Sequence, residues 1–156
     1  MTKTIRTKLW NRADWPVWSL STIDEDGVCN MNICTYVVPV SMEPKAFMVA
    51  LCSGTKTLAN VRSNHRGILQ LLSKDQKALV RRFGYSSGYN KDKMKNLKEP
   101  YSLFKSHAVL DHCLGYAELR FSRLTGGGDH MLGYGEVCTF KNLTSGDPLT
   151  THFLKE

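Results

Sequence analysis

Two long stretches of alternating apolar and polar residues, each divided by a glycine turn, most constrain the fold of this chain. The first is WPVWSLSTIDEDGVCNMNICTYVVPVS at 15–41, and the second is CLGYAELRFSRLTGGGDHMLGYGEVCTF at 113–140. Alternation with a period of two is typical of strands that bury one face, and the DEDG and TGGGDH segments are typical turns. The sequence therefore predicts two antiparallel β-hairpins, and the second strand of the first hairpin is expected to run from about Val28 to Val38.

The segments between these hairpins predict two further strands and two short helices. KAFMVALC at 45–52 is a short apolar run typical of a buried strand, a helix is expected from about Lys56 to Ser63, and GILQLLS at 67–73 is the next strand. SKDQ at 73–76 is a capping box, and the apolar face of the helix after it ends at Gly84. Residues 84–100 are expected to form a polar surface excursion, and the polar segment after 141 predicts no element.

This order of elements predicts a mainly β fold: an antiparallel β-barrel whose ends are plugged by short helices. The sequence contains neither an internal repeat nor a linker, so one domain over residues 1–156 is expected. No apolar run approaches the roughly 20 residues of a membrane helix. The first residues, MTKTIRTKLWNRADW, lack the apolar core of a secretory signal, and a cytoplasmic protein is expected.

The net charge of +7 suggests an anionic partner. The densest basic stretch, NKDKMKNLK at 90–98, is interpreted as a solvated loop or short helix and carries no interleaved aromatic residues for base stacking. A basic nucleic-acid-binding barrel is therefore an alternative that the sequence does not favour. A phosphorylated small molecule explains the sign of the charge equally well.

The cysteines indicate neither a disulfide framework nor a metal cluster, and no metal is expected. They are odd in number, and no two of them form a CxxC pair. All five are interpreted as small core or near-core residues: Cys29, Cys34, Cys52, Cys113 and Cys138.

Three stretches carry candidate site residues. In LCSGTKTLANV at 51–61, hydroxyls and Lys56 precede a helix start, where unpaired N–H groups and the helix dipole favour a phosphate; an ordinary N-cap with a solvated lysine explains the same residues. In NMNICTYVVPV at 30–40, polar side chains lie in a half-buried strand, facing either solvent or a polar-edged ligand. In GGGDHMLGYGEV at 126–137, three glycines allow a close backbone approach, and His130 is either structural or catalytic.

Together these stretches resemble a known family. DEDGVCNMNICTYVVPVS, SGTKTLANVR, LLSKDQKALVRRFGYSSG and GDHMLGYGEV follow, in order and at fitting distances, the pattern of the flavin reductase-like family. The resemblance covers roughly residues 15–140 and implies an FMN-binding antiparallel split β-barrel. It also favours the phosphate interpretation of residues 53–57.

The resemblance implies a role for each matching position. Asn30 and Thr35 would meet the edge of the isoalloxazine ring, and the backbone of Asn32, Ile33, Cys34, Thr35 and Tyr36 would line it. Ser53, Lys56 and Thr57 would hold the FMN phosphate, with Asn60 one helical turn further on. His130 would lie near the flavin and the nicotinamide pocket.

The implied activity is NAD(P)H-dependent reduction of flavin, with hydride transfer to flavin N5. The implied assembly is a homodimer; Trp10, Trp15 and Trp18 near the start of the chain would supply contacts, although simple core packing explains them as well. A downstream monooxygenase or electron-acceptor protein would take the electrons. An FMN electron carrier of the flavoredoxin type, serving a protein partner, is the alternative that shares these sequence features.

Overall fold

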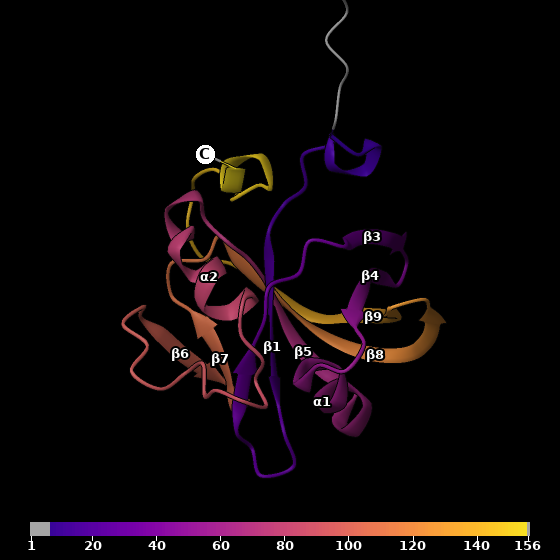
Figure 1. Cartoon of the computed structure of the whole chain (residues 1–156). Helices are drawn as coiled ribbons and strands as arrows, with labels where there is room; N and C mark the ends of the chain where they lie inside the picture. Colours follow the sequence, from indigo (N-terminus) through magenta and orange to yellow (C-terminus); the bar gives the residue numbers. More distant parts are fainter. Residues whose placement is uncertain (1–6, 156) are drawn as a thin grey trace, which may run out of the picture.

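The computed structural model describes residues 7–155, and its main element is one antiparallel sheet (Figure 1). Its seven strands lie in the order β2-β1-β5-β8-β9-β4-β3, and β6 pairs with β7 in a separate two-stranded sheet. The strands are β1 (Trp18–Ile23), β2 (Cys29–Met31), β3 (Val37–Met42), β4 (Lys45–Cys52), β5 (Arg66–Leu71), β6 (Tyr101–Phe104), β7 (His107–Leu110), β8 (Gly115–Gly127) and β9 (His130–Asn142). The helices are α1 (Lys56–Asn64) and α2 (Ala78–Gly84), with short 3-10 turns at Leu9–Asn11, Lys74–Gln76 and His152–Lys155.

The first hairpin forms as expected at its turn. Asp24 Oδ1 accepts hydrogen bonds from the backbone N–H groups of Asp26 and Val28, each at 2.9 Å, and Gly27 takes a φ of 78°. This is the geometry that an Asp at the start of a tight turn and a glycine near its end favour.

The expectation of one continuous strand from Val28 to Val38 is wrong. The regular ladder with β1 ends at Met31, one further bridge joins Cys34 to Trp18 of β1, and the ladder with β4 begins at Val37, so the chain leaves one edge of the sheet and joins the other. Residues 32–36 cross between β2 and β3, the two edge strands. The sheet is thus antiparallel and not closed, and a gap with accessible backbone lies beside residues 32–36.

Both helices bury an apolar face against the sheet. Leu58 and Val61 of α1 belong to one core cluster, together with Leu20 and Val49 of the strands. Phe83 of α2 belongs to a second cluster. The predicted mainly β architecture with two short packed helices is confirmed.

The predicted start of α1 and the predicted capping box are also confirmed. The Thr55 hydroxyl accepts from the Leu58 N–H at the N-terminus of α1. The Ser73 hydroxyl and the Gln76 side chain cap a 3-10 turn reciprocally, as the SKDQ pattern predicts.

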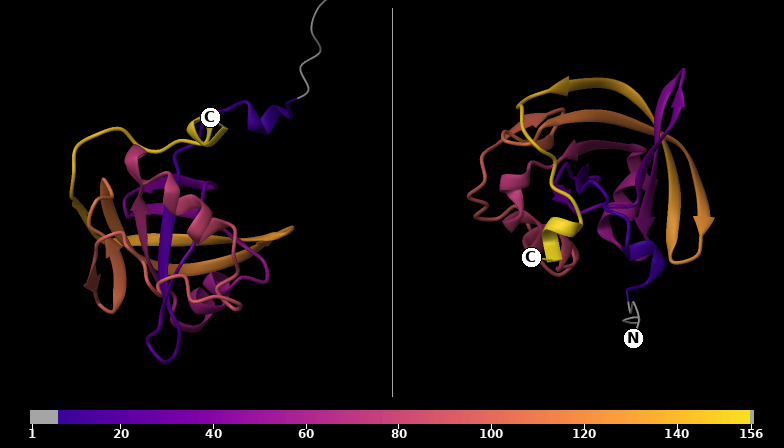
Figure 2. Two further views of the ribbon diagram at one scale, coloured as in Figure 1. Left: turned by 60° about the vertical axis from the view of Figure 1, so that its left-hand side comes forward. Right: turned by 90° about the horizontal axis from the view of Figure 1, so that it is seen from above.

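Three parts differ from the expectations. The turn of the closing hairpin is tighter than expected, because β8 runs to Gly127 and β9 begins at His130, so that most of TGGGDH belongs to the paired strands; the two strands form one long curved ribbon (Figure 2). The β6–β7 hairpin was not predicted. The polar segment after 141 returns to the start of the chain, where Val17 N–H donates to Leu149 O at 2.8 Å.

The cysteine expectation is partly wrong. Cys34 and Cys113 are buried, and Cys29 is half-buried. Cys52, the last residue of β4, and Cys138, in the second half of β9, are exposed. The described residues hold no cluster of three metal-ligating side chains and no helix that is long and apolar enough to span a membrane. Residues 1–6 and 156, which the expected domain of 1–156 includes, lie outside the described part.

Candidate functional site

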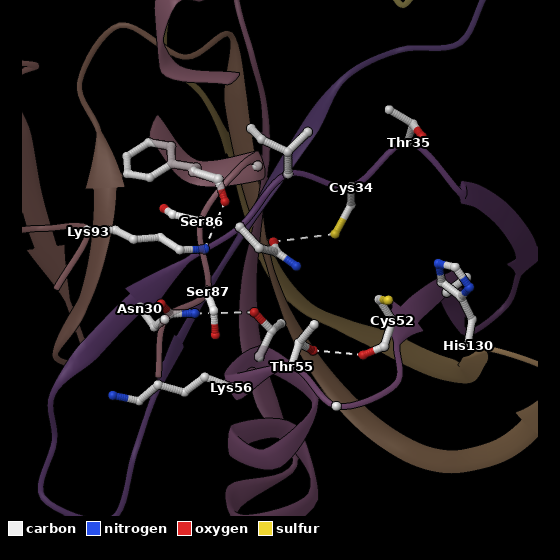
Figure 3. Close-up of a pocket in the computed structure, with 18 of the residues that line it drawn as sticks. Asn30, Cys34, Thr35, Cys52, Thr55, Lys56, Ser86, Ser87, Lys93 and His130 are labelled. Atoms are coloured by element: carbon white, nitrogen blue, oxygen red, sulfur yellow. Dashed lines mark hydrogen bonds between the residues drawn. The ribbon is translucent and has the colours of Figure 1, made fainter. Parts of the chain in front are cut away.

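A cavity of about 360 Å³ opens beside the segment that crosses between the sheet edges (Figure 3). Its walls come from this segment, the start of α1, the chain after α2 and the beginning of β9. It brings together nearly all the residues that the sequence singles out: Asn30, Asn32, Ile33, Cys34, Thr35, Tyr36, Lys56, Thr57 and His130. The polar stretches in three distant parts of the sequence therefore line one cavity.

The crossing segment offers backbone groups to this cavity. Cys34 exchanges both of its backbone hydrogen bonds with Trp18, at 2.8 Å each, and Tyr36 O accepts from Ala50 N–H at 2.9 Å. Neighbouring residues of an extended chain direct their N–H and C=O groups to opposite sides. The backbone of Ile33 and Thr35 is consequently directed away from the sheet, toward the cavity that these residues line.

The side chains of this segment differ in what they already bind. Asn32 Oδ1 accepts from Leu20 N–H at 3.0 Å and from the Cys34 thiol at 3.4 Å, so this amide fixes the crossing to β1. Burial raises the pKa of the Cys34 thiol to about 12, which keeps it protonated at neutral pH. Among the described residues, the Thr35 hydroxyl has no hydrogen-bond partner, and a ligand can use it.

The start of α1 forms a second wall. Thr55 caps the helix by accepting from Leu58 N–H, whereas the N–H groups of Lys56 and Thr57, the first two helical residues, have no acceptor within the helix. The Thr57 hydroxyl accepts from Asn30 Nδ2 at 3.2 Å, and this bond ties α1 to β2. The ammonium nitrogen of Lys56 lies 3.6 Å from Asp24 Oδ2, and the side chain points away from His130 (Figure 3). The positive charge of Lys56 is therefore at the edge of the cavity.

Two residues expected in the site lie outside the cavity lining. Ser53 is exposed, and its backbone N–H donates to Asp129 O at 2.9 Å, because the chain turns at Gly54 before the helix begins. Asn60 is buried on the inner face of α1, where its amide donates to the Thr22 hydroxyl at 3.0 Å. One helical turn beyond Lys56 thus leads into the protein and not toward the cavity.

His130 enters the cavity from the side opposite Lys93 (Figure 3). It pairs with Cys52 across β4 and β9, and its ring lies 5.5 Å from the ring of Tyr36, measured between centroids. His130 Nδ1 lies 2.6 Å from Asp129 Oδ1, and this contact lowers the pKa of Asp129. The Nδ1 contact orients the ring and leaves Nε2 as the nitrogen available to a ligand.

Lys93 lines the cavity although the sequence predicted a solvated loop or short helix around it. Its side chain is only 5% exposed, and its ammonium donates to Met31 O at 3.1 Å and to Phe83 O at 2.8 Å. Burial lowers its pKa from the usual value of 10.5. No carboxylate neutralises it among the described residues, so the cavity holds a buried positive group. A lysine among exposed lysines carries no periodic signal that could have distinguished it.

The excursion after α2 covers this end of the cavity. Ser86, Ser87 and Gly88 line it, and a Cβ atom at Gly88 would lie 2.3 Å from Asn30 Oδ1. Only a residue without a side chain permits this approach. Residues 84–100 are therefore part of the site wall as well as a surface excursion.

Comparisons with known proteins agree with this arrangement. The model of the flavin reductase like domain family matches residues 11–153. The high molecular weight rubredoxin of Moorella thermoacetica is 22% identical over 122 residues, which are 78% of this chain and 53% of that protein. The chain therefore spans about half the length of this curated relative.

Three solved structures share the fold. The styrene monooxygenase flavin reductase of Pseudomonas putida has a TM-score of 0.80 at 18% identity, covering 93% of this chain and 91% of that one. The NADH:FAD oxidoreductase SgcE6 of Streptomyces globisporus has a TM-score of 0.81 at 14% identity, covering 91% and 84%. An FMN-binding protein of Thermus thermophilus has a TM-score of 0.77 at 20% identity, covering 91% and 78%.

The neighbours confirm the split-barrel fold, and the family match covers nearly all described residues. The chain belongs to the flavin reductase-like family.

Proposed function

We propose that this chain is an oxidoreductase that binds FMN and reduces flavin with NAD(P)H. One observation carries the proposal: a single cavity joins an exposed backbone edge at Ile33 and Thr35, a helix start beside Lys56, and a histidine opposite them. A flavin mononucleotide needs donors along a planar polar edge and cationic or N–H partners for its phosphate. Membership in the flavin reductase-like family supports it, as do two structural neighbours, an FMN-binding protein and an NADH:FAD oxidoreductase.

The residues of the cavity fit this cofactor in charge and shape. When bound, FMN supplies the redox chemistry by taking up hydride from NAD(P)H at its N5 atom. The backbone of residues 32–36 would orient the ring edge, and the first turn of α1 with Lys56 would hold the phosphate. The buried ammonium of Lys93 would stabilise negative charge that develops on the reduced ring.

His130 is proposed as the catalytic residue of this chain. Asp129 fixes its Nδ1 side, and Tyr36 packs beside its ring. The free Nε2 nitrogen can orient the nicotinamide amide or hold a proton at the mouth of the cavity. Ser53 and Asn60, which lie outside the cavity lining, have supporting roles at most in this proposal.

The phosphate contact provides a direct test. A charge-assisted hydrogen bond contributes roughly 1.5–3 kcal/mol, so Lys56→Ala should weaken FMN binding about tenfold or more. Riboflavin, which lacks the phosphate, should bind both proteins almost equally. Titration of flavin fluorescence with FMN and riboflavin measures both affinities.

Lys98→Ala is the matched control, because Lys98 is exposed and lines no part of the cavity. It should leave both affinities unchanged. Equal losses of FMN and riboflavin in Lys56→Ala would contradict the phosphate role. Absence of flavin binding by the wild-type protein would contradict the proposed function as a whole.

A second candidate is an FMN electron carrier that passes electrons to a protein and does not turn over nicotinamide. The rubredoxin relative favours it, because its name denotes an electron carrier. Oxidation of NADH or NADPH with added FMN separates the two: turnover supports the reductase, and a coloured protein without turnover supports the carrier.

We further propose a cytoplasmic homodimer that hands reduced flavin or electrons to an acceptor such as a monooxygenase. An exposed apolar face supports the dimer, since Met42 and Phe140 are exposed beside a groove lined by Phe47 and Val137. Trp10 and Trp15 are exposed as well, whereas Trp18 packs against the core. Sedimentation of the purified protein measures the oligomeric state.

A further inference from the structure

Most of the net positive charge of this chain lies in one short segment, which comprises α2, the 3-10 turn before it and most of the excursion after it. Residues 73–98 carry eight lysines and arginines and two aspartates, a net charge of +6, while the whole chain carries +7. The remainder of the chain is therefore almost neutral. Five of the eight cations are exposed: Lys74, Arg81, Lys91, Lys95 and Lys98.

The positive charge of this segment is not neutralised by the protein itself. Within residues 7–155, every ion pair uses a cation from another part of the chain, such as Lys56 with Asp24 at 3.6 Å. Of the two acids in the segment, Asp92 accepts through Oδ1 from two backbone N–H groups, at 3.0 and 3.2 Å. The five exposed cations are therefore free to attract an anionic partner.

Hydrogen bonds place the excursion beside α2. Arg82, in the last turn of the helix, donates through Nε to Lys93 O at 2.8 Å, and its guanidinium also donates to the carbonyl of Lys95. Gln76, before the helix, donates to Glu99 Oε1 at 2.8 Å. The chain thus runs back along α2, so that the five exposed cations share one side of the molecule, which we call the basic surface.

Apolar packing fixes the orientation of the excursion. Met94 and Leu97 pack against the core cluster that contains Phe83 of α2. Lys95 and Lys98, each next to one of these apolar residues, are exposed. The lysines are therefore held outward before any partner arrives, and a surface that is already ordered loses little backbone freedom on binding.

The basic surface borders the flavin cavity. The excursion that carries Lys91 and Lys95 also supplies Ser86 and Ser87 to the cavity wall opposite His130 (Figure 3). A protein seated on the basic surface therefore contacts the outer side of one wall of this cavity. None of the five exposed cations lines the apolar groove proposed for the homodimer, so the two proposed contacts use different surfaces.

Two tyrosines add aromatic area beside these cations. Tyr85, which directly follows α2, is 81% exposed, and Tyr89 in the excursion is 60% exposed. Tyrosine is enriched at protein–protein interfaces, where it buries a large area. Exposed rings also stack on bases, so a nucleic acid is one outcome of the test below.

We propose that the basic surface docks the acidic face of an electron-acceptor protein, which takes electrons from the flavin through the wall formed by the excursion. Opposite charges steer association and raise its rate by about 10-fold to 10³-fold, and electron-transfer contacts bury less than about 1,200 Å². Four of the five exposed cations are lysines. Their ammonium groups are point charges suited to a transient contact, whereas phosphates favour the arginine fork. The inference rests on the proposed function, because the flavin supplies the electrons.

The transfer balances with a one-electron acceptor. Hydride from NAD(P)H and a proton from water reduce the flavin by two electrons. Two acceptor molecules then take one electron each, in turn, and two protons return from the reduced flavin to water. No bond to the chain forms or breaks.

The test uses two small one-electron acceptors of opposite charge: an acidic plastocyanin and the basic cytochrome c. The flavin-loaded protein is photoreduced without oxygen, and stopped-flow absorbance follows reduction of each acceptor. The rate constant for plastocyanin should fall about tenfold between about 0.01 and 0.15 M salt, where the Debye length shortens from about 30 to about 8 Å, and that for cytochrome c should rise. Titration calorimetry of the flavin-free protein with plastocyanin measures docking without electron transfer.

Two charge reversals locate the contact. Lys95→Glu and Lys98→Glu should each slow plastocyanin reduction at low salt about three- to tenfold and weaken its binding to the flavin-free protein by a similar factor. Arg62→Glu is the matched control, because Arg62 is exposed in the last turn of α1 and its reversal changes the net charge equally. It should change both quantities less than twofold, and all three variants should bind flavin as wild type does.

Three results would overturn the inference. Equal effects of Arg62→Glu and Lys95→Glu would show that net charge, and not the basic surface, steers the acceptor. Reduction of plastocyanin that is independent of salt would exclude electrostatic docking. A short DNA duplex that binds the flavin-free protein more tightly than plastocyanin does, and less tightly in Lys95→Glu, would assign the surface to nucleic acid. The proposed function fails separately, if the wild-type protein binds no flavin, whereas docking to the flavin-free protein is measured independently of it.

Discussion

At the scale of single residues, Lys93 differs most from what its position in a polar loop leads one to expect, because its side chain is buried. Its ammonium is buried and satisfies the carbonyls of Met31 and Phe83, which belong to β2 and α2. It is therefore a structural tie between two elements and a positive charge at the cavity. The two roles predict two separable effects of its removal.

We expect Lys93→Met to lower the free energy of unfolding of the flavin-free protein by about 1–3 kcal/mol, because two buried carbonyls lose their donor. If reduced flavin loses about 1.4 kcal/mol of charge stabilisation, its two-electron midpoint potential should fall by about 30 mV. Urea unfolding and a spectroscopic redox titration measure these effects. Lys95→Met, at an exposed neighbour, should change neither; an unchanged potential in Lys93→Met would place its charge away from the flavin.

His130 is the residue for which chemistry and structure are most easily separated. We expect His130→Ala to retain FMN affinity near wild type and to slow flavin reduction by NAD(P)H at least about tenfold, since general acid–base catalysis contributes roughly 10²-fold or more. Stopped-flow bleaching of the flavin measures the rate. The exposed His112, which lines no part of the cavity, gives the control His112→Ala. A wild-type rate in His130→Ala would contradict a catalytic role, and loss of FMN would indicate a structural one.

At the scale of elements, the site depends on how closely the excursion after α2 approaches β2. Gly88 stands where a Cβ would lie 2.3 Å from Asn30 Oδ1, and Asn30 in turn donates to Thr57 of α1. One contact thus joins the excursion, the first hairpin and the helix start. A displacement of any of the three would change the shape of the cavity.

We expect Gly88→Ala to lower the free energy of unfolding by about 1–3 kcal/mol, the usual cost of overpacking, and to weaken flavin binding. Thermal unfolding and flavin titration measure both. Gly126→Ala is the matched control, because a Cβ at that glycine meets nothing within 4 Å. A Gly88→Ala protein with wild-type stability and affinity would show that the excursion can move aside without cost.

At the scale of the whole molecule, the buried His107 should make stability depend on pH. Burial, the largest cause, lowers its pKa below the usual 6.5, and its Nε2 atom has no partner. The charged residues near His107 at that end of the sheet are the buried Glu118 and its two ion-pair partners, Arg66 and Lys105. The folded protein therefore keeps His107 neutral at a pH where the unfolded chain takes up a proton.

This difference favours the unfolded state as pH falls. Above about pH 6.5, His107 is neutral in both states and does not reduce the free energy of unfolding. As the pH falls from there to the lower pKa of the folded state, the free energy of unfolding decreases by at most about 1.4 kcal/mol per pH unit. We expect His107→Gln to flatten the pH dependence between about pH 7.5 and 5.5, measured by urea unfolding. A variant that loses as much stability as wild type over this range would assign the dependence to other groups.

The amino-acid sequence by itself determined the local features of this protein. Alternation in residues 15–41 and 113–140 predicted the hairpins, and hydroxyls before Lys56 predicted the start of α1. SKDQ predicted the capping box of the 3-10 turn at Lys74–Gln76, because each of these features depends on neighbours in the chain. Most of the residues that line the cavity were expected from the resemblance to the flavin reductase-like family that these motifs carry, and not from the polarity of the half-buried strand alone.

Only the tertiary structure decided where the chain changes partners. The pattern of residues 28–38 is the same whether they pair with one strand or cross between two, and the sheet order determines that they cross. Lys93 is buried, and Cys52 and Cys138 are exposed, for the same reason: burial is set by which elements meet and not by the flanking sequence. Long-range packing, which a local pattern does not encode, therefore placed the gap in the sheet and the charge beside it.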